Sequence, residues 1–137
     1  MIYGIGTDIV AVGRLAGVLE RHGESFLDRV LAPDERAELP ELAEARVRFL
    51  ARRWAAKEAF AKAFRTGVRG VVSLASVRVG HEESGAPVLT FGDELAKILT
   101  ERHLQAHLSI SDEHDYAVAF VLIEQIPSGD KACPSDR

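Results

Sequence analysis

The stretch RWAAKEAFAKAF, residues 53–64, is the centre of the longest helix that the sequence predicts. Alanine is frequent around it, and apolar side chains recur at helical spacing from Val47 to Ala61, so we expect a helix over residues 41–64. On the helical wheel Glu58 lies about 40° from Trp54, inside the apolar stripe. The sequence therefore places a carboxylate on the face that a helix normally buries.

Two acidic residues each have a structural and a functional interpretation. Glu58 either forms a buried or half-buried ion pair with Lys62, four residues on, or acts as a metal ligand or general base, with Lys62 beside it for phosphate. Asp8 is either the N-cap of a following helix or a second oxygen ligand for a hard cation. Mg²⁺ usually takes one or two carboxylates and completes its shell with waters and substrate phosphates. The residues alone leave these alternatives open.

Charge is distributed unevenly along the chain. The formal net charge is −4, but residues 46–69 contain eight basic residues and one acid, Glu58, so that segment carries +7 and the remainder −11. Such a segment indicates a solvated helix face or a site for a polyanion. A non-catalytic module that binds nucleic acid or a phosphorylated ligand would explain the basic segment but not the acid on its apolar stripe. We expect a local phosphate site and no nucleic-acid partner.

Size and composition are those of an ordinary globular domain. The chain has 137 residues, 47% hydrophobic and 28% charged. Its one cysteine, Cys133, can form neither an internal disulfide nor a cysteine metal site. We expect a cytoplasmic protein that does not enter a membrane, with one domain over residues 1–125 and a disordered tail over residues 126–137.

Helical patterns dominate the first half of the chain and strand patterns the second, which favours an α+β fold. A short strand opens the chain, and Thr7-Asp8 then offers N-cap chemistry for a helix with the stripe Ile9, Val12, Leu15 and Leu19. The other predicted elements are helices at 26–31, from 34, at 41–64 and at 93–103, and strands at 71–79, 88–91, 106–111 and 116–124.

His107 alternates with apolar neighbours on a predicted strand and shares a face with Ser109 and Ser111. It is either an ordinary hydrogen-bonded residue or part of a site. A serine hydrolase is disfavoured because no Gly-x-Ser-x-Gly elbow occurs. The segment Gly4-Ile5-Gly6 lacks the third glycine of a dinucleotide fingerprint, and no complete phosphate-binding loop is present.

Two motifs resemble those of the holo-acyl-carrier-protein synthases, the small trimeric group of 4′-phosphopantetheinyl transferases. GIGTDIV, residues 4–10, is similar to the family's opening motif, and residues 53–64 are similar to its central helix signature, which normally has Phe at the position of Trp54. Gly85-Ala86-Pro87 and His107-Leu108-Ser109 are weaker matches in the expected order. The resemblance covers residues 1 to about 124 and is highly specific because both strong motifs occur at this spacing.

The resemblance implies a 4′-phosphopantetheinyl transferase-like α+β fold, with an antiparallel sheet packed against one long and several shorter helices. It implies Mg²⁺-dependent transfer of the 4′-phosphopantetheine arm of coenzyme A to a serine of apo acyl carrier protein, in support of fatty acid biosynthesis. Adenosine 3′,5′-bisphosphate would be released. Family members are homotrimers, with the active site in the cleft between neighbouring subunits.

Residue roles follow from the same resemblance. Asp8 and Glu58 would be the Mg²⁺ ligands, and Glu58 would also accept the serine proton, directly or through a metal-bound water. Lys62 would contact the diphosphate of coenzyme A, and Arg53 and His107 would contact its phosphates.

Arg14 and Arg21, on the first long helix, would help to dock the acidic carrier protein. Two positions depart from the family pattern. Arg65-Thr66-Gly67 stands where many relatives have Gly-Thr-Gly, so Arg65 either prevents a close backbone approach of coenzyme A or adds a phosphate contact. Asp112-Glu113 stands where many relatives have a second histidine.

Overall fold

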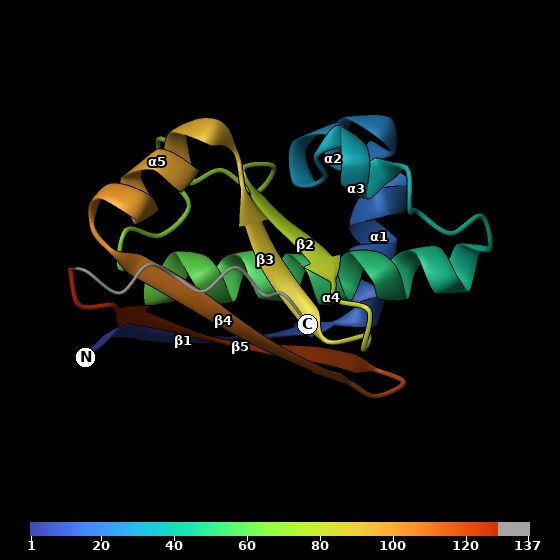
Figure 1. Ribbon diagram of the computed structural model, residues 1–137. Coiled ribbons are helices and arrows are strands. Elements are labelled where there is room, and N and C mark those ends of the chain that lie inside the picture. The colour runs from blue at the N-terminus through green and yellow to red at the C-terminus, as the bar shows by residue number, and fades with distance from the viewer. Residues whose placement is uncertain (129–137) are drawn as a thin grey trace.

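The computed structural model describes residues 1–128 and shows an α+β fold (Figure 1). The elements in chain order are β1 (Ile2–Ala11), α1 (Val12–His22), α2 (Glu24–Val30), α3 (Pro33–Arg36), α4 (Ala43–Ala63), β2 (Val77–His81), β3 (Pro87–Phe91), α5 (Asp93–Glu101), β4 (Leu104–Asp112) and β5 (Tyr116–Gln125). The fold class predicted from the sequence is confirmed. Of the tail predicted to be disordered, residues 129–137 lie outside the described residues, and the amide of Ile126 donates a hydrogen bond to the carbonyl of His103.

Three strands form an antiparallel sheet in the order β1-β5-β4, and β2 and β3 form a separate antiparallel pair. The central strand β5 alternates strictly, with its inward residues fully buried: Ala117, Ala119, Val121 and Ile123. Helix α4 lies along this inner face of the sheet (Figure 1). The main core therefore fills the space between the sheet and α4.

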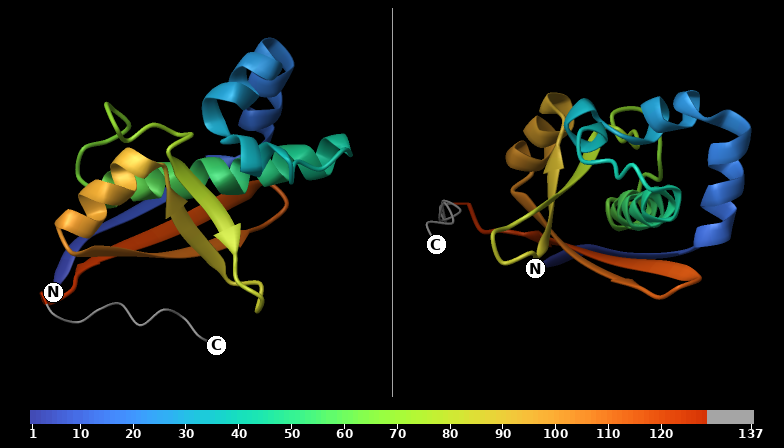
Figure 2. Two further views of the ribbon diagram at one scale, coloured as in Figure 1. Left: turned by 45° about the horizontal axis from the view of Figure 1, so that its top comes forward. Right: turned by 90° about the vertical axis from the view of Figure 1, so that its right-hand side faces the viewer.

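Helix α4 is enclosed on several sides rather than along one stripe. Seen along its axis, the sheet lies below it, α1 on one side, α2 and α3 above, and β2, β3 and α5 on the other side (Figure 2). In its second half alanines are completely or almost completely buried at Ala55, Ala56, Ala59, Ala61 and Ala63. Small side chains all round the helix let its neighbours approach closely, which explains the alanine content noted in the sequence.

The first strand differs from the prediction. It extends to Ala11, and α1 begins only at Val12, with no side-chain capping bond from Ala11. The reason is non-local, because β1 pairs with β5 from Ile2 to Ala11. Asp8 is therefore not an N-cap, and that structural interpretation was wrong. Ile9 lies on the outer face of the sheet, 63% exposed, and not in a helical stripe.

Other boundaries agree more closely. The predicted helices at 26–31 and 93–103 and the strands at 88–91, 106–111 and 116–124 are confirmed within a few residues. The predicted strand at 71–79 is displaced to residues 77–81. Residues 71–76 form a turn instead, in which Ser76 Oγ donates to the carbonyl of Val71 at 2.8 Å. Within residues 1–128, no helix is long and apolar enough to cross a membrane.

A buried charge network joins α3, α4 and β2. Lys57 Nζ donates to Glu35 Oε1 at 2.5 Å and to the carbonyls of Val30 and Leu74, each at 2.7 Å. Glu35 Oε2 accepts from Arg53 at 3.1 Å and from the amide of Val79 at 3.2 Å. Burial lowers the pKa of Lys57 to about 8, while the Glu35 carboxylate opposes that shift. Every polar group of this interior cluster thus has a partner of complementary charge or a carbonyl.

Two glycines let β1 touch the backbone of α4. A Cβ at Gly4 would lie 2.0 Å from the carbonyl oxygen of Ala63, and a Cβ at Gly6 would lie 2.0 Å from the carbonyl oxygen of Ala59. Real Cβ atoms do not approach backbone oxygens so closely, so any side chain here forces strand and helix apart. The Gly4-x-Gly6 spacing fixes the distance between β1 and α4.

Gly6→Ala is expected to lower the free energy of unfolding by at least about 1–3 kcal/mol, because the added methyl group meets backbone and not a flexible side chain. Urea unfolding at one fixed protein concentration measures it. Gly13→Ala in α1 is the matched control, because a Cβ there meets nothing within 4 Å and alanine favours the helix by up to about 1 kcal/mol. Equal midpoints for both variants would contradict this explanation of the glycines.

Candidate active site

Asp8 is the next inward-facing residue of β1 after Gly4 and Gly6, so the same close approach brings its carboxylate to α4. There Lys62 Nζ lies 3.2 Å from Asp8 Oδ1 and 2.9 Å from the carbonyl oxygen of Thr7. The Asp8 side chain is 17% exposed and that of Lys62 is 54% exposed. A carboxylate in a shallow recess is thus held by a lysine that remains open to solvent.

Glu58 completes this group from the preceding turn of α4. The pKa of Glu58 is raised above its ordinary value, chiefly by burial and then by the nearby charge of Asp8, while Lys62 and Arg14 oppose the shift. The alternative of a Glu58–Lys62 ion pair is not found in residues 1–128, where Lys62 pairs with Asp8 instead. Two carboxylates and two cationic groups therefore share one small region.

This donor set fits a hard divalent cation. Two like charges in a partly desolvated position repel each other, and a cation between them would relieve that repulsion. No group of three or more His, Cys, Asp or Glu side chains within residues 1–128 could enclose a metal. Mg²⁺ does not need one, because one or two carboxylates with waters and substrate phosphates satisfy it. Asp8 and Glu58 are therefore the residues that could hold such an ion.

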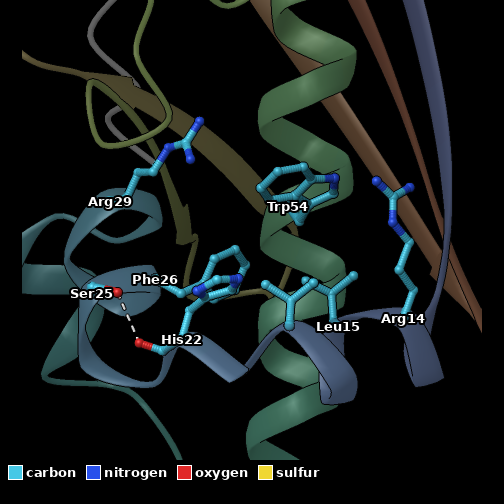
Figure 3. A pocket seen from close by; sticks show the side chains of 8 residues that line it. Arg14, Leu15, His22, Ser25, Phe26, Arg29 and Trp54 are labelled. Carbon is cyan, nitrogen blue, oxygen red and sulfur yellow. Dashed lines mark hydrogen bonds between the residues drawn. The ribbon is translucent and has the colours of Figure 1, made fainter. Parts of the chain in front are cut away.

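A pocket of about 290 Å³ lies between α1, α2 and α4 (Figure 3), and Trp54 in its lining precedes Glu58 by one turn of α4. Its floor is aromatic, with Phe26 stacked on Trp54 at a centroid distance of 5.9 Å. Basic side chains at Arg14, His22 and Arg29 surround that floor. The pocket therefore suits a ligand that presents an apolar side chain or group with negatively charged groups around it.

The two predicted docking residues, Arg14 and Arg21, differ in their position relative to this pocket. Arg14 lines the pocket and lies near enough to Glu58 to lower its pKa, so it connects the pocket with the carboxylate pair. Arg21 is not among the pocket-lining residues, and its guanidinium lies back along α1 over Gly17.

Arg53 lies apart from Asp8, Glu58 and Lys62. It is 3% exposed, and its guanidinium donates to Glu35 at 3.1 Å and to Glu38 at 2.7 Å while covering the ring of Phe49. Its hydrogen bonds are directed to protein carboxylates. Its donors are therefore already engaged within the chain, and we do not propose Arg53 as a phosphate contact.

His107 lies on the opposite face of the sheet from Asp8. Its Nε2 atom is 2.9 Å from Glu124 Oε1, and both side chains are exposed by 42–50%. His107 pairs in register with Leu122, which pairs with the outward-facing Ile5. Within one chain the sheet itself therefore separates His107 from Asp8.

The sequence did not reveal the buried Glu35–Lys57 pair or the conformation of Arg65. The position of Glu35, three residues after Ala32, is the signal that could have indicated an inward-facing carboxylate. Its side chain accepts the Ala32 amide at the start of α3. Arg65 adopts a positive φ of 73° just after α4, and its guanidinium lies over the ring of Tyr3 at 5.5 Å. Glycine is the usual residue in that conformation.

Comparison with known proteins adds to this geometry. Residues 4–121 match the sequence profile of the 4′-phosphopantetheinyl transferase superfamily. A holo-[acyl-carrier-protein] synthase of Dechloromonas aromatica is 54% identical over 124 residues, covering 90% of this chain and 98% of that protein. The crystal structure of the Neisseria meningitidis holo-[acyl-carrier-protein] synthase is similar with a TM-score of 0.85 and 46% identity, covering 90% of this chain and 99% of that one. A Bacillus anthracis synthase in complex with CoA (3′,5′-ADP) is similar with a TM-score of 0.78 and 34% identity, covering 92% and 99%.

Proposed function

Because the chain belongs to the holo-[acyl-carrier-protein] synthases of the 4′-phosphopantetheinyl transferase superfamily, we propose that Asp8, Glu58 and Lys62 are its catalytic centre. The enzyme transfers the 4′-phosphopantetheine of coenzyme A to a serine of apo acyl carrier protein and releases adenosine 3′,5′-bisphosphate. The observation that carries the site is the convergence of these three side chains where β1 touches α4.

Asp8, Glu58 and Lys62 have different proposed roles in the transfer. Asp8 and Glu58 would hold Mg²⁺, which when bound supplies charge neutralisation for the diphosphate oxygens. Lys62 presents an ammonium on a flexible stem with three rotatable donors, a point charge that can contact the diphosphate oxygens. Glu58 also accepts the proton of the carrier's serine hydroxyl, as a general base positioned beside the diphosphate.

The pocket beside the site is the proposed docking surface for the carrier protein. Arg14 and Arg29 at its rim attract acidic side chains, and the Phe26–Trp54 floor accepts an apolar one. Arg21, on the same helix, adds positive charge along the approach. Such charges act mainly on encounter and orientation.

We also propose a homotrimer with active sites shared between subunits. The outer face of the sheet exposes large apolar side chains, with Ile5 at 60%, Ile9 at 63% and Phe120 at 43%. In register these residues join Val118 and Leu122 into one continuous patch, which a partner subunit would cover. A shared site would also bring His107 of one subunit to the coenzyme A phosphates at Lys62 of the next, which the sheet prevents within one chain.

Phe120→Glu is expected to convert the trimer to monomers and to reduce transfer, because a carboxylate would be buried at the centre of this patch. Size-exclusion chromatography with light scattering gives the mass, and the transfer assay gives the activity. Leu42→Glu is the control, because Leu42 is 77% exposed outside the sheet. A trimeric, fully active Phe120→Glu protein would exclude this face as the interface.

The direct test of the metal is transfer with and without it. Incubation with apo acyl carrier protein, coenzyme A and Mg²⁺ should add one phosphopantetheine to the carrier by mass spectrometry. Removing divalent ions with EDTA should abolish the addition, and excess Mg²⁺ should restore it. Undiminished transfer in EDTA would exclude the metal and leave the transferase function intact.

We further propose that residues 1–125 form one domain that acts in the cytoplasm to supply fatty acid biosynthesis with holo carrier protein. The alternative of a nucleic-acid-binding module has no supporting observation beyond the basic segment, of which Lys57 and Arg53 are buried in carboxylate pairs.

A further inference from the structure

Helix α4 carries two lysines that bind carboxylates in opposite ways. The side chain of Lys57 is completely buried, and its three acceptors are all interior groups. The side chain of Lys62 is 54% exposed, and its partners are Asp8 and the carbonyl of Thr7. Lys57 is therefore fixed in place, whereas Lys62 can leave its partners for solvent without being buried unpaired.

The carboxylate that Lys62 holds is one of the two that we assign to the metal. Lys62 Nζ lies 3.2 Å from Asp8 Oδ1, so a divalent cation that approaches this oxygen from the same side has to displace the ammonium. A half-exposed ion pair of this kind contributes little stability, so a stronger competitor can displace the ammonium.

The charges of Asp8, Glu58, Lys62 and Arg14 explain why the Lys62 ammonium is held in this region. Asp8 and Glu58 lie close enough to repel each other in a partly buried position. The Lys62 ammonium compensates part of this negative charge in the free enzyme. The ammonium thus neutralises part of the negative charge that a divalent cation would neutralise more completely.

We propose that Lys62 and the divalent cation compete for Asp8, and that the diphosphate of coenzyme A favours the cation by drawing Lys62 away from Asp8. The inference rests on the proposed function, in which Asp8 and Glu58 bind the metal and Lys62 binds the diphosphate. Its consequence is that coenzyme A and the metal each strengthen the binding of the other. Lys62 is then a positioning residue for the metal as well as a phosphate contact.

The first test measures Mn²⁺ binding by electron paramagnetic resonance, without coenzyme A. Lys62→Met is expected to bind Mn²⁺ about 3- to 10-fold more tightly than the wild type, because the competitor has gone. Arg14→Met is the matched control, since Arg14 carries the same charge near Glu58 but makes no ion pair with Asp8 in the described residues. Equal strengthening in both variants would show a general charge effect and overturn the competition.

The second test repeats the titration with saturating coenzyme A. In the wild type, coenzyme A is expected to tighten Mn²⁺ binding at least about fivefold. Adenosine 3′,5′-bisphosphate lacks the diphosphate and should have a much smaller effect. In Lys62→Met the effect of coenzyme A should be at least about threefold smaller, because only direct metal–phosphate contact remains. The same coupling in wild type and variant would contradict the proposal.

Two further variants separate this inference from the proposed function. If Asp8→Asn and Glu58→Gln bind Mn²⁺ like the wild type, the proposed metal site is wrong. If they lose Mn²⁺ binding while Lys62→Met changes nothing, the metal site stands and only the competition fails. Melting temperatures of all variants, measured without metal, identify any protein that has not folded.

Discussion

Glu58→Gln is expected to reduce phosphopantetheine transfer about 10²- to 10⁴-fold, with the fold retained. The substitution keeps the size of the side chain but removes the charge that we assign to metal binding and the base that we assign to the serine proton. Glu44→Gln is the control, because Glu44 is exposed at the other end of the same helix. The measurement is the rate of carrier modification at saturating Mg²⁺ and coenzyme A. A variant that keeps more than about a tenth of the wild-type rate would show that Glu58 has neither role.

The same variant should not be less stable than the wild type in the absence of metal. The pKa of Glu58 is raised in the folded chain, by burial and then by Asp8. An acid of this kind lowers stability as pH rises through the interval between its unfolded and folded pKa values, so at neutral pH its charge opposes folding. We expect Glu58→Gln to melt at an equal or higher temperature than the wild type at pH 7. A clearly lower melting temperature would instead indicate a structural role for the carboxylate.

Lys57→Met is expected to lower the free energy of unfolding by about 3–5 kcal/mol, because it removes the ammonium from a buried carboxylate. Glu35 would keep Arg53 as a partner on one oxygen, but the carbonyls of Val30 and Leu74 would each lose a donor. Urea unfolding at fixed protein concentration measures the loss.

Lys62→Met is the matched control for this prediction. It removes the same group from the same helix, but from a half-exposed ion pair, and should cost less than about 1 kcal/mol. Similar losses in the two variants would mean that burial is not what gives Lys57 its importance. The comparison thus tests whether one lysine is structural and the other free to move.

The sequence allowed the carboxylate pair to be predicted without indicating how it is built. Asp8 was identified as a ligand candidate, but local signals placed it at a helix N-terminus, because Thr-Asp before a periodic apolar run is typical of one. Its strand conformation depends on β5, more than a hundred residues later in the chain. Pairing at that distance leaves no trace in a local pattern.

The ion-pair partners of Lys62 and Arg53 could not be identified from the sequence for the same reason. Spacing on a helix predicts a Glu58–Lys62 pair, yet Lys62 binds Asp8 across the contact between strand and helix. Arg53 belongs to a basic segment that appears solvated in sequence, yet its partners Glu35 and Glu38 come from an earlier segment of the chain. Helix periodicity predicts which residues share a face, but not which distant residues will meet them there.

Strand β5 lies between β1 and β4, so neither outer strand has its neighbour until residues 116–125 have left the ribosome. During most of synthesis β1 is an unpaired strand whose Ile5 and Ile9 are available to other nascent chains. Helix α4 is also made long before the sheet that covers it. We therefore expect ribosome-bound chains that end before residue 116 to resist folding and to depend on chaperones, whatever the stability of the finished protein.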